Sequence, residues 1–224
     1  MRYEQCALGK LKYVVRYPDG FSADEKYPLI FCLHGAGYRG GDYDRIMANP
    51  FFKETEKQEG FPFVMAAPIC SEDTWFDLWG ELKTLVVKLA SQSFVDVKRI
   101  YMMGASMGGY GTWQLAMSMP QYFAAIAPIC GGGMYWNAGR LLNVPVWAFH
   151  GALDQAVLPE ESRKMVDAVN KKGGQAKLTL YPENGHNAWS DTYSNPELFR
   201  WFLQHENTNA LELINEYSDA DAFG

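Results

Sequence analysis

The strongest constraint on the fold is a five-residue turn, Gly104-Ala105-Ser106-Met107-Gly108, that separates an apolar run from a helical pattern. Residues 97–103 before the turn predict a buried strand, and residues 107–119 after it carry apolar residues at helical spacing. A serine on such a strand-to-helix turn is held in a tight backbone conformation that exposes its hydroxyl. The amide groups at the start of the helix favour negative charge beside it. The turn therefore predicts a reactive serine, Ser106, on an α/β scaffold.

A serine hydroxyl needs a base to become a nucleophile, and the chain offers four histidines for that role. His34 precedes the serine, His150 closes a strand pattern and is interpreted as a structural residue, and His205 lies on an amphipathic helix and is interpreted as a surface residue. His186 follows the predicted strand 177–181 in a loop, where reactive groups of open α/β sheets gather. We therefore predict that His186 is the base.

The base needs an orienting acid. Where a reactive serine lies on such a strand-to-helix turn, the acid comes between the serine and the histidine in the chain. Asp154 follows the predicted strand 144–149 and fits that order. Asp167 lies on a charged helix face, and Asp191 comes after the histidine. Glu183 shares the loop of the histidine and serves only as a reserve acid. The predicted triad is therefore Ser106, Asp154 and His186.

Together these segments resemble the α/β-hydrolases, and more narrowly the small, lidless carboxylesterases related to dienelactone hydrolase, phospholipase/carboxylesterase and feruloyl esterases. The resemblance covers residues 33–186 in the order of the family and rests on four segments: Leu33-His34-Gly35-Ala36-Gly37, the turn around Ser106, His150-Gly151 to Asp154, and Gly185-His186. It implies an α/β-hydrolase fold and ester hydrolysis through the serine.

The resemblance also implies an oxyanion hole, because attack on a carbonyl group creates a negatively charged oxygen. One donor is the backbone N–H of Met107, the residue after the nucleophile, and the other falls at Ala36. Gly37 allows close approach of the backbone, and His34 helps to hold this loop. Removal of one such donor costs about 2.7–4 kcal/mol of transition-state stabilisation.

Strands and helices alternate along the chain, which predicts a mostly parallel sheet with helices on both faces and no large cap domain. Strands are predicted at 11–17, 29–33, 63–67, 99–103, 124–127, 144–149 and 177–181, and helices at 75–92, 107–119, 159–172 and 196–205. The segment between Ile129 and Val144 is too short for a helical lid, so we expect an open site. Residues 1–206 form one predicted domain, and residues 207–224 form a predicted acidic tail that is partly disordered.

The substrate is less constrained by the sequence. Aromatic residues gather in loops near the predicted strand ends: Tyr38, Trp75, Phe76, Tyr135, Trp136 and Trp189. Aromatic walls suit acyl groups, aryl groups and sugars. We expect Trp75, Trp189 and Gly37 to contact the substrate, although the two tryptophans would equally suit packing. Feruloyl, acetyl-sugar and short-chain esters all remain open.

The composition of the chain limits the kinds of partner that we expect it to bind. The net charge of −6 argues against nucleic acid, and no uninterrupted apolar run is long enough to span a bilayer. The first residues lack an apolar signal region, so we expect a cytoplasmic protein, or a secreted one whose signal has been removed. The four cysteines have no metal-binding spacing. We therefore expect reduced thiols, no metal, no cofactor and a small-molecule ester as the partner.

Three other functions stay open. A serine peptidase of the prolyl-oligopeptidase type shares this catalytic domain, but the chain has no propeller domain to select peptides by size. A dienelactone-type activity usually uses cysteine as the nucleophile, and Ser106 stands at that position. A non-enzymatic relative that acts as a binding module commonly loses the serine or the histidine, whereas this chain has every candidate for the triad.

Overall fold

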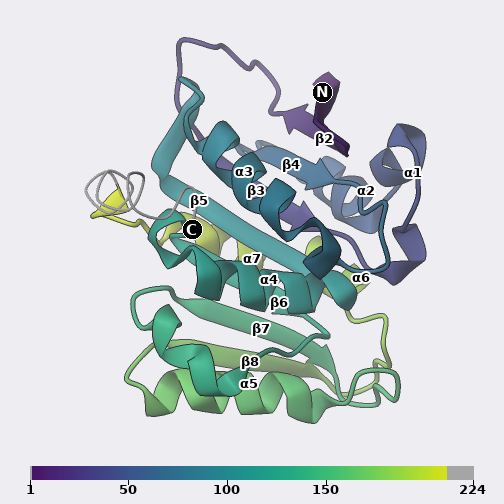
Figure 1. The fold of residues 1–224 in the computed structure, drawn as a ribbon, viewed down its shortest axis with the longest axis vertical. Coiled ribbons are helices and arrows are strands. Elements are labelled where there is room, and N and C mark those ends of the chain that lie inside the picture. The colour runs from purple at the N-terminus through teal and green to yellow at the C-terminus, as the bar shows by residue number, and fades with distance from the viewer. Residues whose placement is uncertain (1, 211–224) are drawn as a thin grey trace.

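Eight strands form one sheet within residues 2–210, the part of the chain that the computed structural model describes (Figure 1). Their order across the sheet is β1-β2-β4-β3-β5-β6-β7-β8, and only the β1–β2 and β2–β4 pairs among them are antiparallel. The strands are β1 (Arg2–Leu8), β2 (Leu11–Tyr17), β3 (Tyr27–Leu33), β4 (Val64–Pro68), β5 (Val95–Ala105), β6 (Ala125–Ile129), β7 (Val146–Gly151) and β8 (Ala176–Tyr181). The predicted mostly parallel sheet is therefore confirmed.

Helices cover both faces of the sheet, as predicted. One face packs against α3 (Trp79–Ala90), α4 (Met107–Ser118) and α5 (Pro159–Lys171), and the other packs against α1 (Tyr43–Met47), α2 (Pro50–Glu56), α6 (Trp189–Ser194) and α7 (Pro196–Leu203). Successive side chains of a strand point to opposite faces, so Met102 belongs to the first core and Met103 to the second. Figure 1 shows α3, α4 and α5 together in front of the strands.

Some element boundaries differ from the prediction. The predicted helix 75–92 begins as a short 3₁₀ helix, η2 (Trp75–Leu78), before α3 starts. Thr74 and Asp77 form a capping box at its start. The carboxylate of Asp77 accepts hydrogen bonds from the backbone N–H and the hydroxyl of Thr74, and the Thr74 side chain accepts from the backbone N–H of Asp77. Strand β1 was not predicted, since it lies at the sheet edge and none of its side chains is fully buried. Edge strands of this kind lack the apolar alternation on which sequence prediction depends.

The segment after β6 holds a short 3₁₀ helix, η4 (Tyr135–Leu141), and no cap domain is inserted there. Ala138 and Leu141 pack into the core, while Tyr135 and Trp136 are exposed. Across residues 2–210, no helix combines the length and the apolar character needed to cross a membrane.

The predicted tail begins on the domain itself. Asn207 donates a hydrogen bond from its backbone to the Lys98 carbonyl and one from its side chain to the Gln121 carbonyl, and Ala210 is buried. Residues 207–210 therefore pack against the domain. The remainder of the predicted tail, 211–224, lies outside the described residues.

Candidate active site

The turn between β5 and α4 holds Ser106 in a conformation that L-residues rarely adopt. Its φ is 56° and its ψ is −119°, outside the left-handed helical region. Such a backbone costs about 1–3 kcal/mol, which the surrounding structure must offset. Gly108 allows the turn to lie against β3, because a Cβ atom at this position would sit 2.0 Å from the Leu33 carbonyl oxygen. The turn presents the Ser106 hydroxyl to His186.

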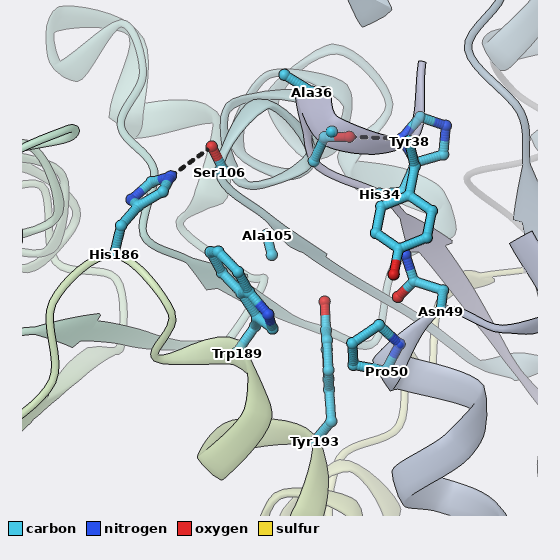
Figure 2. A pocket seen from close by; sticks show the side chains of 12 residues that line it. His34, Ala36, Tyr38, Asn49, Pro50, Ala105, Ser106, His186, Trp189 and Tyr193 are labelled. Carbon is cyan, nitrogen blue, oxygen red and sulfur yellow. Dashed lines mark hydrogen bonds between the residues drawn. The ribbon is translucent and has the colours of Figure 1, made fainter. Parts of the chain in front are cut away.

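The three residues of the predicted triad are hydrogen-bonded in series. Ser106 Oγ lies 2.8 Å from Nε2 of His186, and Nδ1 of the same ring lies 2.7 Å from Oδ2 of Asp154 (Figure 2 shows the first of these bonds). They come from the loops that follow β5, β8 and β7, so the carboxyl ends of three parallel strands bring them together. The arrangement can move a proton from the serine to the histidine.

Asp154 is buried and its carboxylate is fully engaged. Oδ1 accepts hydrogen bonds from the backbone N–H groups of Ala156 at 2.9 Å and Val157 at 3.0 Å. Burial alone would raise the pKa of Asp154, but the hydrogen bonds from His186 and from these two amides outweigh it and lower the pKa. The acid is therefore ionised, and it holds the proton of His186 on Nδ1, which leaves Nε2 to accept the serine proton.

The competing acids lie elsewhere. Glu183 and Asp167 are exposed, and neither contacts the His186 ring through a hydrogen bond or ion pair. Asp191 accepts a hydrogen bond from the Asn184 side chain. The loop that carries the histidine is instead tied to the loop of Asp154, because Ala152 N–H bonds to the Tyr181 carbonyl and Leu153 N–H to the Asn184 carbonyl, both at 2.9 Å.

His34 holds the loop that leads to Ala36. Its Nδ1–H donates to the Gly35 carbonyl at 2.8 Å, and its Nε2 accepts from the backbone N–H of Cys70 at 3.0 Å. The ring is buried, and burial lowers its pKa to about 4, so it is neutral at pH 7. His34 is thus a structural residue of this loop, as the resemblance implied.

The expectation that Trp75 lines the substrate site is wrong. Trp75 has no exposed surface, its Nε1–H donates to the His34 carbonyl at 3.0 Å, and its ring centroid lies 4.7 Å from that of His34. A large apolar ring whose one polar group is satisfied by a buried carbonyl is most stable in the core. The indole therefore packs against His34 and supports the loop that leads to Ala36.

A cavity of about 270 Å³ opens beside the serine (Figure 2). The expected site residues Ala36, Gly37 and Trp189 line it together with Ser106 and His186. Trp189 stands edge-on to the His186 ring, with centroids 5.3 Å apart. The other residues that line the cavity are His34, Gly35, Tyr38, Asn49, Pro50, Ala105 and Tyr193.

Sequence reasoning missed three of these wall residues. Asn49 and Pro50 begin α2, with the Asn49 side chain as the helix cap, and this pair signals a helix start rather than a pocket. Tyr193 lies in the six-residue helix α6 and is buried except toward the cavity. In Figure 2 the Tyr193 hydroxyl points into the space between Trp189 and Asn49. A short helix has too few residues for its inner face to be read from periodicity.

Cys130, His150 and Asp154 are the one group of potential metal ligands found within residues 2–210, with ligand atoms within 4.8 Å of one another. Their polar atoms already have partners: His150 bonds to Ser162 Oγ and the Val157 carbonyl, and the carboxylate bonds as described. Burial, reinforced by the nearby carboxylate, raises the pKa of Cys130 to about 12, so the thiol keeps its proton. These residues form a hydrogen-bonded cluster rather than a vacant ligand set.

Known proteins that resemble this chain include one hydrolase family and several esterases. The model of the dienelactone hydrolase family matches residues 67–216. The "probable feruloyl esterase C" of Aspergillus niger is 25% identical over 190 residues, which cover 81% of this chain and 69% of that protein. The bifunctional acetylxylan esterase/xylanase XynS20E of Neocallimastix patriciarum is 27% identical over 135 residues, 58% of this chain and 20% of that protein. A crystal structure of a thermostable esterase superposes with a TM-score of 0.78 at 29% identity and covers 91% of this chain and 63% of its own.

Proposed function

The chain belongs to the dienelactone hydrolase family, and from that premise we propose that it is a serine carboxylesterase acting on short-chain or aryl carboxylic esters. The observation that carries the proposal is the unbroken hydrogen-bonded series from Ser106 through His186 to Asp154, whose serine and histidine line the cavity. The esterases among its relatives support the same reaction class.

The proposed reaction proceeds in two acyl transfers. Ser106 Oγ attacks the ester carbonyl while His186 Nε2 takes the hydroxyl proton, and the histidine then gives that proton to the leaving alcohol. The acyl group stays on the serine until water attacks, with His186 again as the base, and the free acid leaves. Asp154 remains ionised throughout and stabilises the charge that forms on the imidazole ring.

The proposed oxyanion hole uses the backbone N–H groups of Met107 and Ala36. Met107 is the first residue of α4, and first-turn amides have no acceptor inside their own helix. Ala36 lines the cavity and begins the short 3₁₀ helix η1 (Ala36–Tyr38). Each donor is expected to contribute about 2.7–4 kcal/mol to stabilisation of the tetrahedral intermediate.

The cavity sets the size of the acyl group. A cavity of roughly 150 Å³ is enough to hold benzene, so one of about 270 Å³ suits an aryl or short aliphatic acyl chain rather than a long one. Trp189, Tyr38 and Tyr193 provide aromatic walls, and the Asn49 side chain adds a polar group. We therefore propose that aryl esters of the feruloyl type and short-chain esters are both accepted.

A substrate panel with wild type and Ser106→Ala tests this function. p-Nitrophenyl acetate, p-nitrophenyl laurate, methyl ferulate, acetylated xylan and peptide amides would be compared, with circular dichroism to show that the variant folds. We expect hydrolysis of the short and aryl esters by wild type alone, labelling of Ser106 by a fluorophosphonate, and no rate increase above the micelle-forming concentration of the laurate.

The other outcomes would point to other functions. Wild-type turnover by a folded Ser106→Ala would contradict the proposal. Cleavage of the peptide amides without the esters would favour a peptidase. No hydrolysis and no labelling by the wild type would favour a binding module.

A further inference from the structure

Behind Asp154 lies a second histidine that the proposed reaction does not use. His150, the penultimate residue of β7, is fully buried, and both ring nitrogens have partners. We propose that His150 is a positioning residue: it fixes the turn that carries Asp154 and thereby the hydrogen bond between Asp154 and His186. This role rests on the proposed function, since it acts through the triad.

The connection to Asp154 runs through one peptide group. His150 Nε2–H donates to the Val157 carbonyl at 2.9 Å, and the N–H of Val157 donates to Oδ1 of Asp154 at 3.0 Å. The same Nε2 lies 3.2 Å from Oδ2, the oxygen that bonds to His186. The ring therefore holds one end of the turn formed by residues 154–157. It also lies beside Oδ2 of Asp154, the carboxylate oxygen that bonds to His186.

The other side of the ring is anchored to different elements. Nδ1 lies 2.8 Å from Ser162 Oγ, which belongs to α5, and the same Oγ lies 2.9 Å from the carbonyl oxygen of Gly131, just after β6. Ser162 has no exposed surface. The imidazole is thus held between α5 and the Asp154 turn, and it cannot rotate without breaking buried hydrogen bonds, each of which is costly to leave unmade.

Small displacements at this point matter for the reaction. A 1 Å misplacement of a catalytic group can cost about 100-fold in rate even when the change lies away from the reacting atoms. A histidine that only filled the core would affect stability, whereas a histidine that sets the place of Asp154 affects kcat at constant fold. The two ring nitrogens of His150 contact different partners, so a substitution can keep one contact and remove the other. The effect on kcat can then be compared with the effect on stability.

Two amide substitutions at His150 separate the two nitrogens. The amide nitrogen of glutamine falls near the place of Nε2, and that of asparagine falls near the place of Nδ1. His150→Gln keeps a donor for the Val157 carbonyl, whereas His150→Asn keeps only the contact with Ser162. We expect His150→Asn to lower kcat for p-nitrophenyl acetate by about 10- to 100-fold with little change in KM, and His150→Gln to restore most of it.

The control variant removes a buried hydrogen bond away from the triad. Tyr101 Oη donates to the His205 carbonyl at 2.9 Å, so Tyr101→Phe should lower the thermal midpoint without changing kcat. The proton NMR signal of the His186 Nδ1–H, which is displaced downfield by its bond to Asp154, reports the geometry directly. We expect this signal to shift or broaden in His150→Asn and to keep its position in His150→Gln and Tyr101→Phe.

Equal kcat values in wild type and both His150 variants would overturn the inference, and so would equal losses in both variants that merely follow their thermal midpoints. If His150→Asn does not fold, His150→Leu removes the same donor to the Val157 carbonyl, and an unchanged kcat and NMR signal in that variant would also overturn it. If wild type shows no hydrolysis that depends on Ser106, the proposed function fails, while the NMR comparison still decides whether His150 positions Asp154.

Discussion

A Cβ atom at Gly151 would lie 2.0 Å from the carbonyl oxygen of Gly185, so the end of β7 and the loop after β8 are in direct backbone contact. These two segments carry the proposed acid and the proposed base, Asp154 and His186, which are hydrogen-bonded to each other. The 2.7 Å bond between the two side chains therefore depends on the close packing of these two backbone segments.

Gly151→Ala should push the two loops apart. We expect kcat/KM to fall by roughly 100-fold, since the base moves relative to the acid, and the free energy of unfolding to fall by about 1–3 kcal/mol from the overlap. Ester kinetics and thermal unfolding measure the two effects. Gly139→Ala is the matched control, because its added methyl group would meet only the Lys172 side chain, at 3.9 Å. Similar losses in both variants would contradict the packing argument.

The backbone strain at Ser106 gives a prediction about stability without activity. Ser106→Gly and Ser106→Ala should both be inactive, but glycine adopts a φ of 56° without strain, whereas alanine retains the strain. We expect the glycine variant to be more stable than the alanine variant by about 1 kcal/mol. Chemical denaturation of the two variants measures this difference, and equal midpoints would show that the turn is relaxed.

Asp154→Asn should lower kcat by about 10⁴-fold, because an amide cannot hold the proton of His186 on Nδ1 as a carboxylate does. Glu183→Gln is the control, since that side chain is exposed and lies outside the series of hydrogen bonds. Steady-state kinetics on p-nitrophenyl acetate compares the two. Full activity in the first variant with loss in the second would move the acid to Glu183.

His34 makes stability depend on pH. Its folded pKa is about 4 against an ordinary value of 6.5, because burial disfavours the charged ring. The unfolded chain therefore binds a proton at His34 between these values and the folded chain does not, so this contribution to stability is complete above pH 6.5 and falls as the pH drops toward 4.

The loss is on the order of 3 kcal/mol for this one group. His34→Gln keeps an acceptor for the Cys70 amide but does not titrate, so we expect a flatter decline than in wild type. Denaturation midpoints measured from pH 7.5 to 4 test this, and parallel curves for the two proteins would refute it.

Substitutions of Trp189 and Trp75, the two tryptophans of the expected substrate site, should have different effects on KM and on stability. Trp189→Ala removes a cavity wall and should raise KM for methyl ferulate more than for p-nitrophenyl acetate. Trp75→Phe removes the bond to the His34 carbonyl from a fully buried site, so it should lower stability by about 1–3 kcal/mol and affect both substrates equally. Ester kinetics with both substrates distinguishes selectivity from support, and equal effects of Trp189→Ala on the two esters would assign that residue to packing.

The sequence was sufficient for the parts of the molecule that depend on local pattern. The turn around Ser106 stands between a long apolar strand and a helix, and chain order then selected Asp154 and His186 from few candidates. The structure places these three side chains in one hydrogen-bonded series. The strands of the parallel core were likewise predictable, because they are apolar on both faces.

The cavity could not be predicted in the same way. Asn49 caps α2 and Tyr193 lies in α6, so the two residues line one cavity only after these helices pack on the same face of the sheet. Both helices are too short to show a periodic face. Trp75 was misassigned because its neighbours in sequence suggest an exposed loop, while its partner, the His34 carbonyl, is 41 residues away in the chain. Contacts of that kind arise from tertiary packing and leave no mark on local sequence.

The backbone at Ser106 also bears on how the family diverges. On the proposed function, hydrolysis needs the Ser106 hydroxyl, although glycine would suit the same φ better and would stabilise the fold. A lineage released from selection for hydrolysis would therefore gain stability by losing the serine, and glycine would be the favoured replacement. The residue at the position of Ser106 would then indicate whether a given relative has remained under selection as an enzyme.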